Sequence, residues 1–161
     1  MLKRPGIVGS LLLLASHIAW ADPCHVAIES NDLMRFTQQQ LTVPANCAEI
    51  EVTLTHIGTL PAKVMGHNWV LAKTSDVAAI ASAGIGAGFS NNYHPVGDQR
   101  IVAATRIVGG GESTTVKFSS TALQSGADYT FFCSAPGHTS IMKGKFVFGE
   151  PLGQFTARSS N

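Results

Sequence analysis

Polar and apolar residues alternate along Glu49–His56, and this alternation constrains the fold more than any other feature of the sequence. Because successive side chains of a β-strand point to opposite faces, the pattern predicts a half-buried strand. The inner face of that strand would carry Ile50, Val52, Leu54 and His56. Similar alternation over residues 114–118 and 142–148 predicts two more strands.

One segment departs from this pattern. Apolar and small residues recur at helical spacing from Val77 to Ile85, and Ser75 and Asp76 before them suggest a cap and first turn. Gly84, Gly86 and Gly88 lack the spacing of a dinucleotide-binding loop, so they indicate a fraying, loop-like helix end. Seven or eight strands with one short helical insertion predict an all-β, antiparallel Greek-key sandwich or barrel.

The two ends of the chain differ from this single domain. Residues 1–21 begin with the cations Lys3 and Arg4, continue with an apolar stretch and end in small residues, which is typical of a secretory signal peptide. Its removal would leave a domain over residues 22–148 with no membrane anchor. Residues 149–161 lose the alternation and gain Gly, Pro and Ser, so we expect a mobile C-terminal tail.

Charge excludes one class of partner. Only 13% of the residues are charged, the formal net charge is +1, and no basic cluster is present. Binding to nucleic acid depends on cations that neutralise phosphates, so nucleic acid is not expected as a partner.

Three cysteines are present, and export would favour a disulfide between two of them. A bond between Cys24 and Cys47 would stabilise the fold by about 3 to 4 kcal/mol. Cys133 would then be left as a free thiol. Alone, such a thiol is most often an inert, buried side chain.

The neighbours of Cys133 indicate a different role for this residue, that of a metal ligand. His138 and Met142 follow it within ten residues, so a thiol, an imidazole and a thioether lie close together in the chain. Thiolate and thioether ligands favour copper, whereas a zinc site usually has more thiolates or more histidines. His67, in an uncharged segment, is the candidate for a second nitrogen, while His56 on its apolar strand face is expected to be a core histidine.

Two segments carry a family resemblance. Residues 65–70 (MGHNWV) and residues 131–144 (FFCSAPGHTSIMKG) resemble the azurins, bacterial blue copper proteins of the cupredoxin fold. The likeness extends from Cys24 to about Phe148 and includes the cysteine pair and the helical insertion. Four residues separate Cys133 from His138, whereas a gap of two would resemble plastocyanin or pseudoazurin.

The resemblance implies a mononuclear copper site and a periplasmic electron carrier that shuttles electrons between redox proteins. No coordination position would remain open for a substrate, so enzymatic activity is not expected. Asn68 and Ser134 would link the two ligand-bearing segments by hydrogen bonds. The implied ligands are His67, Cys133 and His138 in a trigonal set, Met142 as a long axial ligand, and the carbonyl oxygen of Gly66 opposite to it.

Electrons are expected to leave through an exposed edge of His138, within a ring of apolar side chains that docks the partner. The resemblance suggests c-type cytochromes or periplasmic dehydrogenases and reductases as partners. A periplasmic copper chaperone or store is the alternative function, although the chain has few methionines for such a role. The expected ring consists of Met34, Leu60, Val64, Met65, Ile85, Ala135, Pro136 and Ile141.

Three positions depart from the usual azurin pattern. Ala104 stands where a surface histidine is frequent, and Ile57 precedes Gly58 where a proline is familiar. Ala135 replaces an aromatic residue beside the metal-binding loop, which puts the packing near the sulfur and the reduction potential in doubt.

Overall fold

The computed structural model describes residue 22 and residues 24–149. The expected signal peptide of residues 1–21, and the expected tail apart from Gly149, lie outside the described residues. In the described part, no helix has the length and apolar character needed to cross a membrane.

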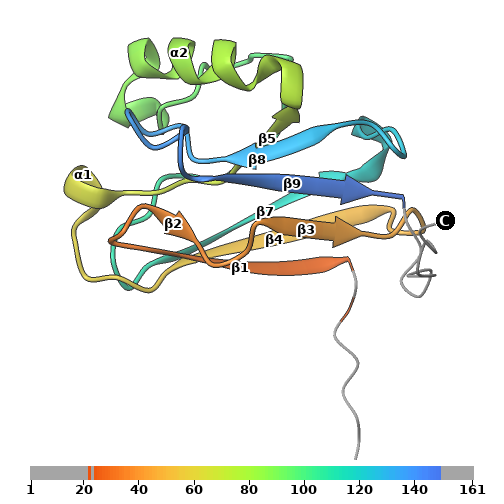
Figure 1. Cartoon of the computed structure of the whole chain (residues 1–161), viewed down its shortest axis with the longest axis horizontal. Helices are drawn as coiled ribbons and strands as arrows, with labels where there is room; N and C mark the ends of the chain where they lie inside the picture. Colours follow the sequence, from red (N-terminus) through yellow and green to blue (C-terminus); the bar gives the residue numbers. More distant parts are fainter. Residues whose placement is uncertain (1–21, 23, 150–161) are drawn as a thin grey trace, which may run out of the picture.

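Two β-sheets face each other across the core, and helix α2 covers the outer side of one of them (Figure 1). One sheet has the strand order β2-β1-β4-β7 and the other β3-β9-β8-β5-β6. The helices are α1 (Ala62–Met65) and α2 (Val77–Ala87). The strands are β1 (His25–Asn31), β2 (Arg35–Phe36), β3 (Gln40–Val43), β4 (Glu49–His56), β5 (Val70–Lys73), β6 (Ile101–Ala104), β7 (Ser113–Ser119), β8 (Tyr129–Phe132) and β9 (Lys143–Phe148).

This architecture confirms the predicted β-sandwich and corrects two of its details. Nine strands are assigned in the described residues instead of seven or eight. Two pairs, β1 with β4 and β3 with β9, are parallel, so the antiparallel arrangement that the sequence predicts is wrong for these two pairs. The partners in these pairs are separated in sequence by other strands, and local alternation carries no information about such pairing.

The alternation in β4 is confirmed, because Ile50, Val52, Leu54 and His56 are all fully buried. They face a core centred on Trp69, whose ring lies 6.2 Å from that of Phe131. Full burial of an aliphatic or phenyl side chain stabilises a fold by about 1.5 to 3 kcal/mol, so this core contributes most of the driving force.

The disulfide between Cys24 and Cys47 is present. It joins the residue before β1 to the segment before β4, two strands that also pair in parallel. The bridge therefore holds together two parts of one sheet that no short turn connects.

Helix α2 forms where the apolar spacing predicted it, and it buries Val77, Ile80 and Gly84. The predicted cap was wrong: Asp76 has helical backbone angles and its side chain makes no capping hydrogen bond, since a 3-10 turn over Thr74–Asp76 precedes the helix. The prediction of a fraying end was also wrong for Gly84. A Cβ atom there would lie 2.1 Å from the carbonyl oxygen of Tyr93, so only glycine permits this close packing.

Candidate metal centre

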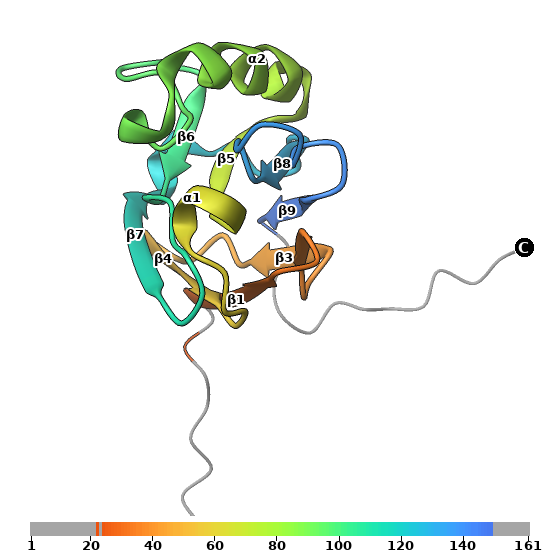
Figure 2. The ribbon, with the colours of Figure 1, turned by 90° about the vertical axis from the view of Figure 1, so that its left-hand side faces the viewer.

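Three segments meet at the end of the sandwich that carries α1 (Figure 2). His67 follows α1 and is fixed by two main-chain hydrogen bonds with Val108, of 2.9 and 2.8 Å. Cys133 directly follows β8, and its amide donates to the carbonyl of Met142 at 2.9 Å. His138 lies in the loop between Cys133 and Met142, and this loop forms the third side of the site.

The donor atoms of His67, Cys133 and His138 converge. The Nδ1 atoms of the two histidines lie 3.2 Å apart, and the Cys133 sulfur lies 3.9 Å from His67 Nδ1 and 3.6 Å from His138 Nδ1. A metal ion about 2.0 Å from each nitrogen and 2.3 Å from the sulfur, at trigonal angles, would separate the nitrogens by about 3.5 Å and each nitrogen from the sulfur by about 3.7 Å. The three residues therefore fit a single ion.

Burial sets the protonation states of this cluster. His67 and Cys133 are fully buried, while 9% of His138 is exposed. Desolvation lowers the pKa of His67 to about 4 and also lowers the pKa of His138, so both imidazoles are neutral near pH 7. Desolvation raises the pKa of the Cys133 thiol to about 11, so this thiol keeps its proton until a cation replaces it.

A main-chain carbonyl orients the ring of His67. The Nε2 atom of His67 lies 2.9 Å from the carbonyl oxygen of Asn31. Because a carbonyl can only accept, Nε2 carries the proton of the neutral ring, and Nδ1 presents a lone pair to the other two donors.

Two further residues of the implied ligand set lie beside this cluster. Met142 is fully buried, and its amide donates to the carbonyl of His138 at 2.8 Å. Gly66 separates α1 from His67, and a Cβ atom on it would lie 2.2 Å from the carbonyl oxygen of Ala62. No larger residue would leave this backbone in place next to His67.

Asn68 and Ser134 connect the two ligand-bearing segments. Asn68 Nδ2 donates to the Ser134 hydroxyl at 2.8 Å, and the Ser134 amide donates to Asn68 Oδ1 at 2.9 Å. Both residues are buried and each directly follows a donor residue. The pair therefore fixes the spacing between His67 and Cys133.

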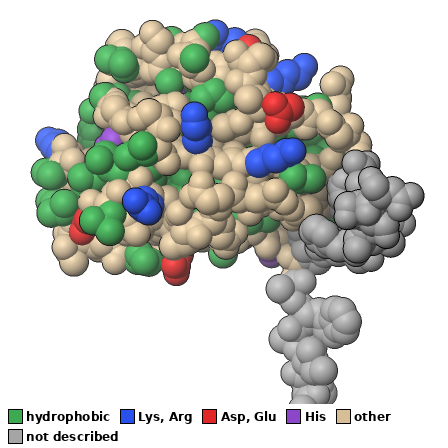
Figure 3. All heavy atoms as spheres, viewed as in Figure 1, with side chains coloured by type: hydrophobic (Ala, Val, Ile, Leu, Met, Phe, Trp, Pro, Cys, Tyr) green, Lys and Arg blue, Asp and Glu red, His purple; other side chains and the backbone are tan. Residues whose placement is uncertain are grey.

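Apolar side chains gather on the surface at this end of the molecule (Figure 3). Of the expected ring, Leu60, Val64, Pro136, Ile85 and Ile141 are exposed, and Met34 and Met65 are half-buried. Leu33 and Ile57, which are not part of the expected ring, are also exposed.

Ala135 does not belong to that exposed ring, because it is only 4% exposed, and its inclusion was wrong. Its small side chain instead lines a hollow of about 180 Å³ between the metal-binding loop and α2, together with Ala81, Ile85 and Pro136. The loop therefore leaves space beside Ala135, while Cys133 itself stays fully buried.

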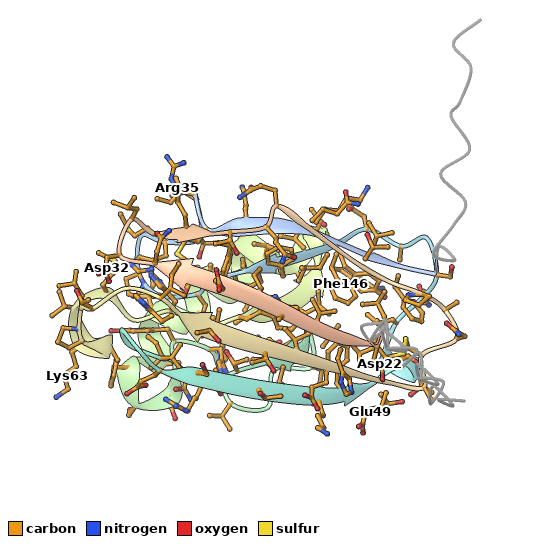
Figure 4. The ribbon with its side chains drawn as sticks, turned by 90° about the horizontal axis from the view of Figure 1, so that it is seen from below. Asp22, Asp32, Arg35, Glu49, Lys63 and Phe146 are labelled. Atoms are coloured by element: carbon orange, nitrogen blue, oxygen red, sulfur yellow. A yellow bond between two sulfur atoms is a disulfide. The ribbon has the colours of Figure 1, made fainter. Side chains whose placement is uncertain are left out.

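Charged side chains surround the apolar surface only sparsely. Asp32, Arg35 and Lys63 lie at this end, and Arg35 and Lys63 point outward (Figure 4). Asp32 is turned inward, since it accepts hydrogen bonds from the amides of Thr59 at 2.8 Å and Leu60 at 3.3 Å. No sequence motif predicts this role of Asp32, because its carboxylate accepts hydrogen bonds from main-chain amides that are distant in the sequence.

Comparisons with known proteins agree with this geometry. A family model described as copper binding proteins, plastocyanin/azurin family, matches residues 22–149. The azurin of Bordetella pertussis is 46% identical over 140 residues, which cover 86% of this chain and 93% of that protein. Azurin iso-2 of Methylomonas sp. strain J is 48% identical over 127 residues, covering 79% and 98% respectively.

A solved structure of the azurin Az-iso2 from Methylomonas sp. strain J superposes with a TM-score of 0.76 at 46% identity, covering 79% of this chain and 98% of that one. Residues 22–149, which the family model matches, contain the two sheets, the disulfide and the buried His67, Cys133 and His138 cluster described above. This chain belongs to the plastocyanin/azurin family of copper-binding proteins.

Proposed function

We propose that this protein is a periplasmic electron carrier with one mononuclear blue copper site. The observation that carries the proposal is the buried triangle of two neutral imidazoles and one thiol, whose donor atoms lie 3.2, 3.6 and 3.9 Å apart. Such a His₂Cys set with a weak axial ligand is characteristic of copper sites that transfer electrons. Copper bound there would supply a one-electron couple between Cu(I) and Cu(II).

The proposed ligand set has five members, and the chain holds each of them in place. The hydrogen bonds of His67 with Asn31 and Val108, and of Cys133 with Met142, fix the donors before any ion arrives. A rigid site loses little energy to reorganisation when an electron enters or leaves. The residues that would hold copper are His67, Cys133 and His138, with the Met142 sulfur and the Gly66 carbonyl oxygen as weaker donors.

The burial of the donors favours a carrier over an enzyme. His67, Cys133 and Met142 are fully buried, so these donors present no surface to a substrate in solution. Only the edge of His138 reaches the surface, where 9% of this residue is exposed. Electrons would therefore pass through the His138 ring, and bond-making chemistry would lack space.

The docking surface is proposed to be the apolar surface around His138, which now includes Leu33 and Ile57 and excludes Ala135. Electron-transfer partners use small, short-lived interfaces, below about 1,200 Å² in total. Such a surface would suit c-type cytochromes or periplasmic dehydrogenases and reductases. Localisation in the periplasm rests on residues 1–21, whose composition matches a signal peptide.

The test is the visible absorption and electron spin resonance of the purified protein loaded with Cu(II). An intense blue thiolate band is expected, and Cys133→Ser should abolish it. Ser140→Ala, an exposed hydroxyl in the same loop, is the matched control and should retain the band. A pale wild-type protein that releases Cu(I) readily to a chelator would contradict the proposal and favour a chaperone or store.

A further inference from the structure

Asn92 lies in the segment after helix α2 and has a left-handed backbone, with φ of 54°. It ends the 3-10 turn over Phe89–Asn91, and Tyr93 after it is left-handed as well. Residues other than glycine rarely adopt this conformation, and asparagine is among those that tolerate it best. Asn92 is half-buried, so the contacts of its backbone and side chain can explain this unfavourable conformation.

The main-chain carbonyl of Asn92 reaches one of the ligand-bearing segments. It accepts a hydrogen bond of 2.6 Å from Asn68 Nδ2, the same nitrogen that donates to Ser134 at 2.8 Å. Both protons of this amide nitrogen are therefore used, and Asn68 Oδ1 is used by the Ser134 amide. Because every polar atom of the Asn68 side chain is hydrogen-bonded, this side chain has one orientation. Asn92 supplies the one acceptor that lies outside the two ligand-bearing segments.

The side chain of Asn92 reaches the strand-like segment that supports His67. Its Oδ1 accepts a hydrogen bond of 2.9 Å from the amide of Ile107. The next residue, Val108, exchanges two main-chain hydrogen bonds with His67. One residue thus contacts both the Asn68–Ser134 link and the segment that holds the His67 backbone.

We infer that Asn92 is a positioning residue of the metal centre: its carbonyl orients Asn68, its side chain anchors Ile107, and together they fix His67 relative to Cys133. Losing its Oδ1 leaves the Ile107 amide without a partner. Losing its left-handed backbone moves the carbonyl away from Asn68, which frees Asn68 to turn away from Ser134. The inference rests on the metal centre and not on which proteins exchange electrons with it.

The adjacent residue provides a matched control. Asn91 is exposed, and its Nδ2 donates to the carbonyl of Ala87 at the end of α2 at 2.9 Å. Asn91→Ala therefore removes a hydrogen bond of the same segment without touching either ligand-bearing segment. Asn92→Asp keeps the acceptor oxygen and tolerates the left-handed backbone, so it should behave as a rescue variant.

The experiment measures amide hydrogen exchange in the metal-free protein and the thiolate-to-copper absorption after loading with Cu(II). In Asn92→Ala, exchange at Ile107 and Ser134 should accelerate by about tenfold, as expected for the loss of one buried hydrogen bond. The absorption band should shift or broaden. Asn92→Gly, which keeps the backbone conformation but not Oδ1, should accelerate exchange at Ile107 more than at Ser134.

Asn92→Asp and Asn91→Ala should match the wild type in both measurements. The inference is overturned if Asn92→Ala exchanges at the wild-type rate at Ser134 and keeps the wild-type band. It is also overturned if Asn91→Ala causes the same changes, because the segment would then act only through its general stability. If Asn92→Ala does not fold, the comparison of Asn92→Gly with Asn92→Asp tests the inference, because only the glycine variant should accelerate exchange at Ile107. The exchange readout is independent of electron transfer, so it remains informative even if the carrier proposal fails.

Discussion

The imidazole rings of His56 and His67 are stacked, with centroids 4.7 Å apart and planes inclined by 11°. His56 is fully buried, and both of its nitrogens are occupied: Nδ1 accepts from the Gly58 amide at 3.0 Å, and Nε2 faces the Met65 carbonyl at 2.9 Å. The amide can only donate and the carbonyl can only accept, so these two contacts require the tautomer in which Nε2 donates and Nδ1 accepts. A core histidine thus supports the ring of a proposed ligand.

His56→Leu should therefore destabilise the metal-free protein by about 2 kcal/mol. The leucine fills a similar volume but leaves the Gly58 amide and the Met65 carbonyl without their partner. Urea unfolding at pH 7 measures the change. Thr55→Val is the control, since it removes only an exposed hydroxyl contact with Ser113 and should change stability by less than about 0.5 kcal/mol. Equal losses in the two variants would show that the two hydrogen bonds of His56 contribute nothing specific.

Asp32 should make stability depend on pH in the acid range. The hydrogen bond from the Thr59 amide lowers the pKa of the Asp32 carboxyl below its usual value of 3.8, and that from Leu60 adds to it. In this pH range the unfolded chain then binds more protons than the folded chain. The stabilisation by the Asp32 carboxylate is therefore complete above the pKa of the unfolded state, and it is lost as the pH falls through the pKa of the folded state. The difference in unfolding free energy between wild type and Asp32→Asn should accordingly shrink from pH 7 to pH 2.

Asp22→Asn serves as the control for the Asp32 prediction. Its side chain is more than half exposed, so this substitution should change the free energy of unfolding by less than about 0.5 kcal/mol. If Asp32→Asn keeps the same difference from wild type at both pH values, the carboxylate does not stabilise the Thr59–Leu60 loop through its charge.

Metal affinity should rise with pH because of Cys133. The pKa of its thiol, raised to about 11 by burial, means that binding as a thiolate releases one proton at any pH below that value. His67, with a pKa lowered to about 4, is already neutral at pH 7 and releases none. Between pH 7 and pH 10 the apparent affinity should thus increase about tenfold per pH unit.

Competition with a chelator of known pH dependence measures this slope. Cys133→Ser should bind more weakly and with a nearly flat dependence over the same range, because a serine hydroxyl does not ionise there. Below pH 4 the wild-type slope should become steeper as His67 takes up a proton. A wild-type affinity that is constant from pH 7 to pH 10 would mean that the thiol is already ionised in the metal-free protein.

Local patterns explain which parts of this structure could be predicted from the sequence. The alternation in β4 and the spacing in α2 each report the burial of one face, and both elements appear where they were expected. The short spacing from Cys133 to Met142 likewise keeps three candidate donors near one another. The partnership with His67, 66 residues away from Cys133, came from the uncharged segment and the family resemblance.

Features that depend on distant main-chain atoms could not be predicted in this way. The carbonyls of Asn31 and Asn92 orient His67 and Asn68, yet a carbonyl group has no signature in the sequence. The parallel pairing of β1 with β4 depends on the path of the chain between them. The sequence predicts Ala135 in the apolar ring around His138, whereas in the structure α2 lies on one side of its loop.

Substitutions in the docking surface can distinguish docking by apolar burial from docking by charge attraction. Val64 is 65% exposed within the apolar surface, and Val96 is 82% exposed in the segment between α2 and β6. Val64→Lys and Val64→Glu should both lower the second-order rate constant of electron exchange with a c-type cytochrome by about tenfold, because either charge must be desolvated at the interface. Val96→Lys should leave it within about twofold. Stopped-flow absorbance at several salt concentrations measures these constants, and opposite effects of the lysine and glutamate variants would show that charge attraction controls docking instead.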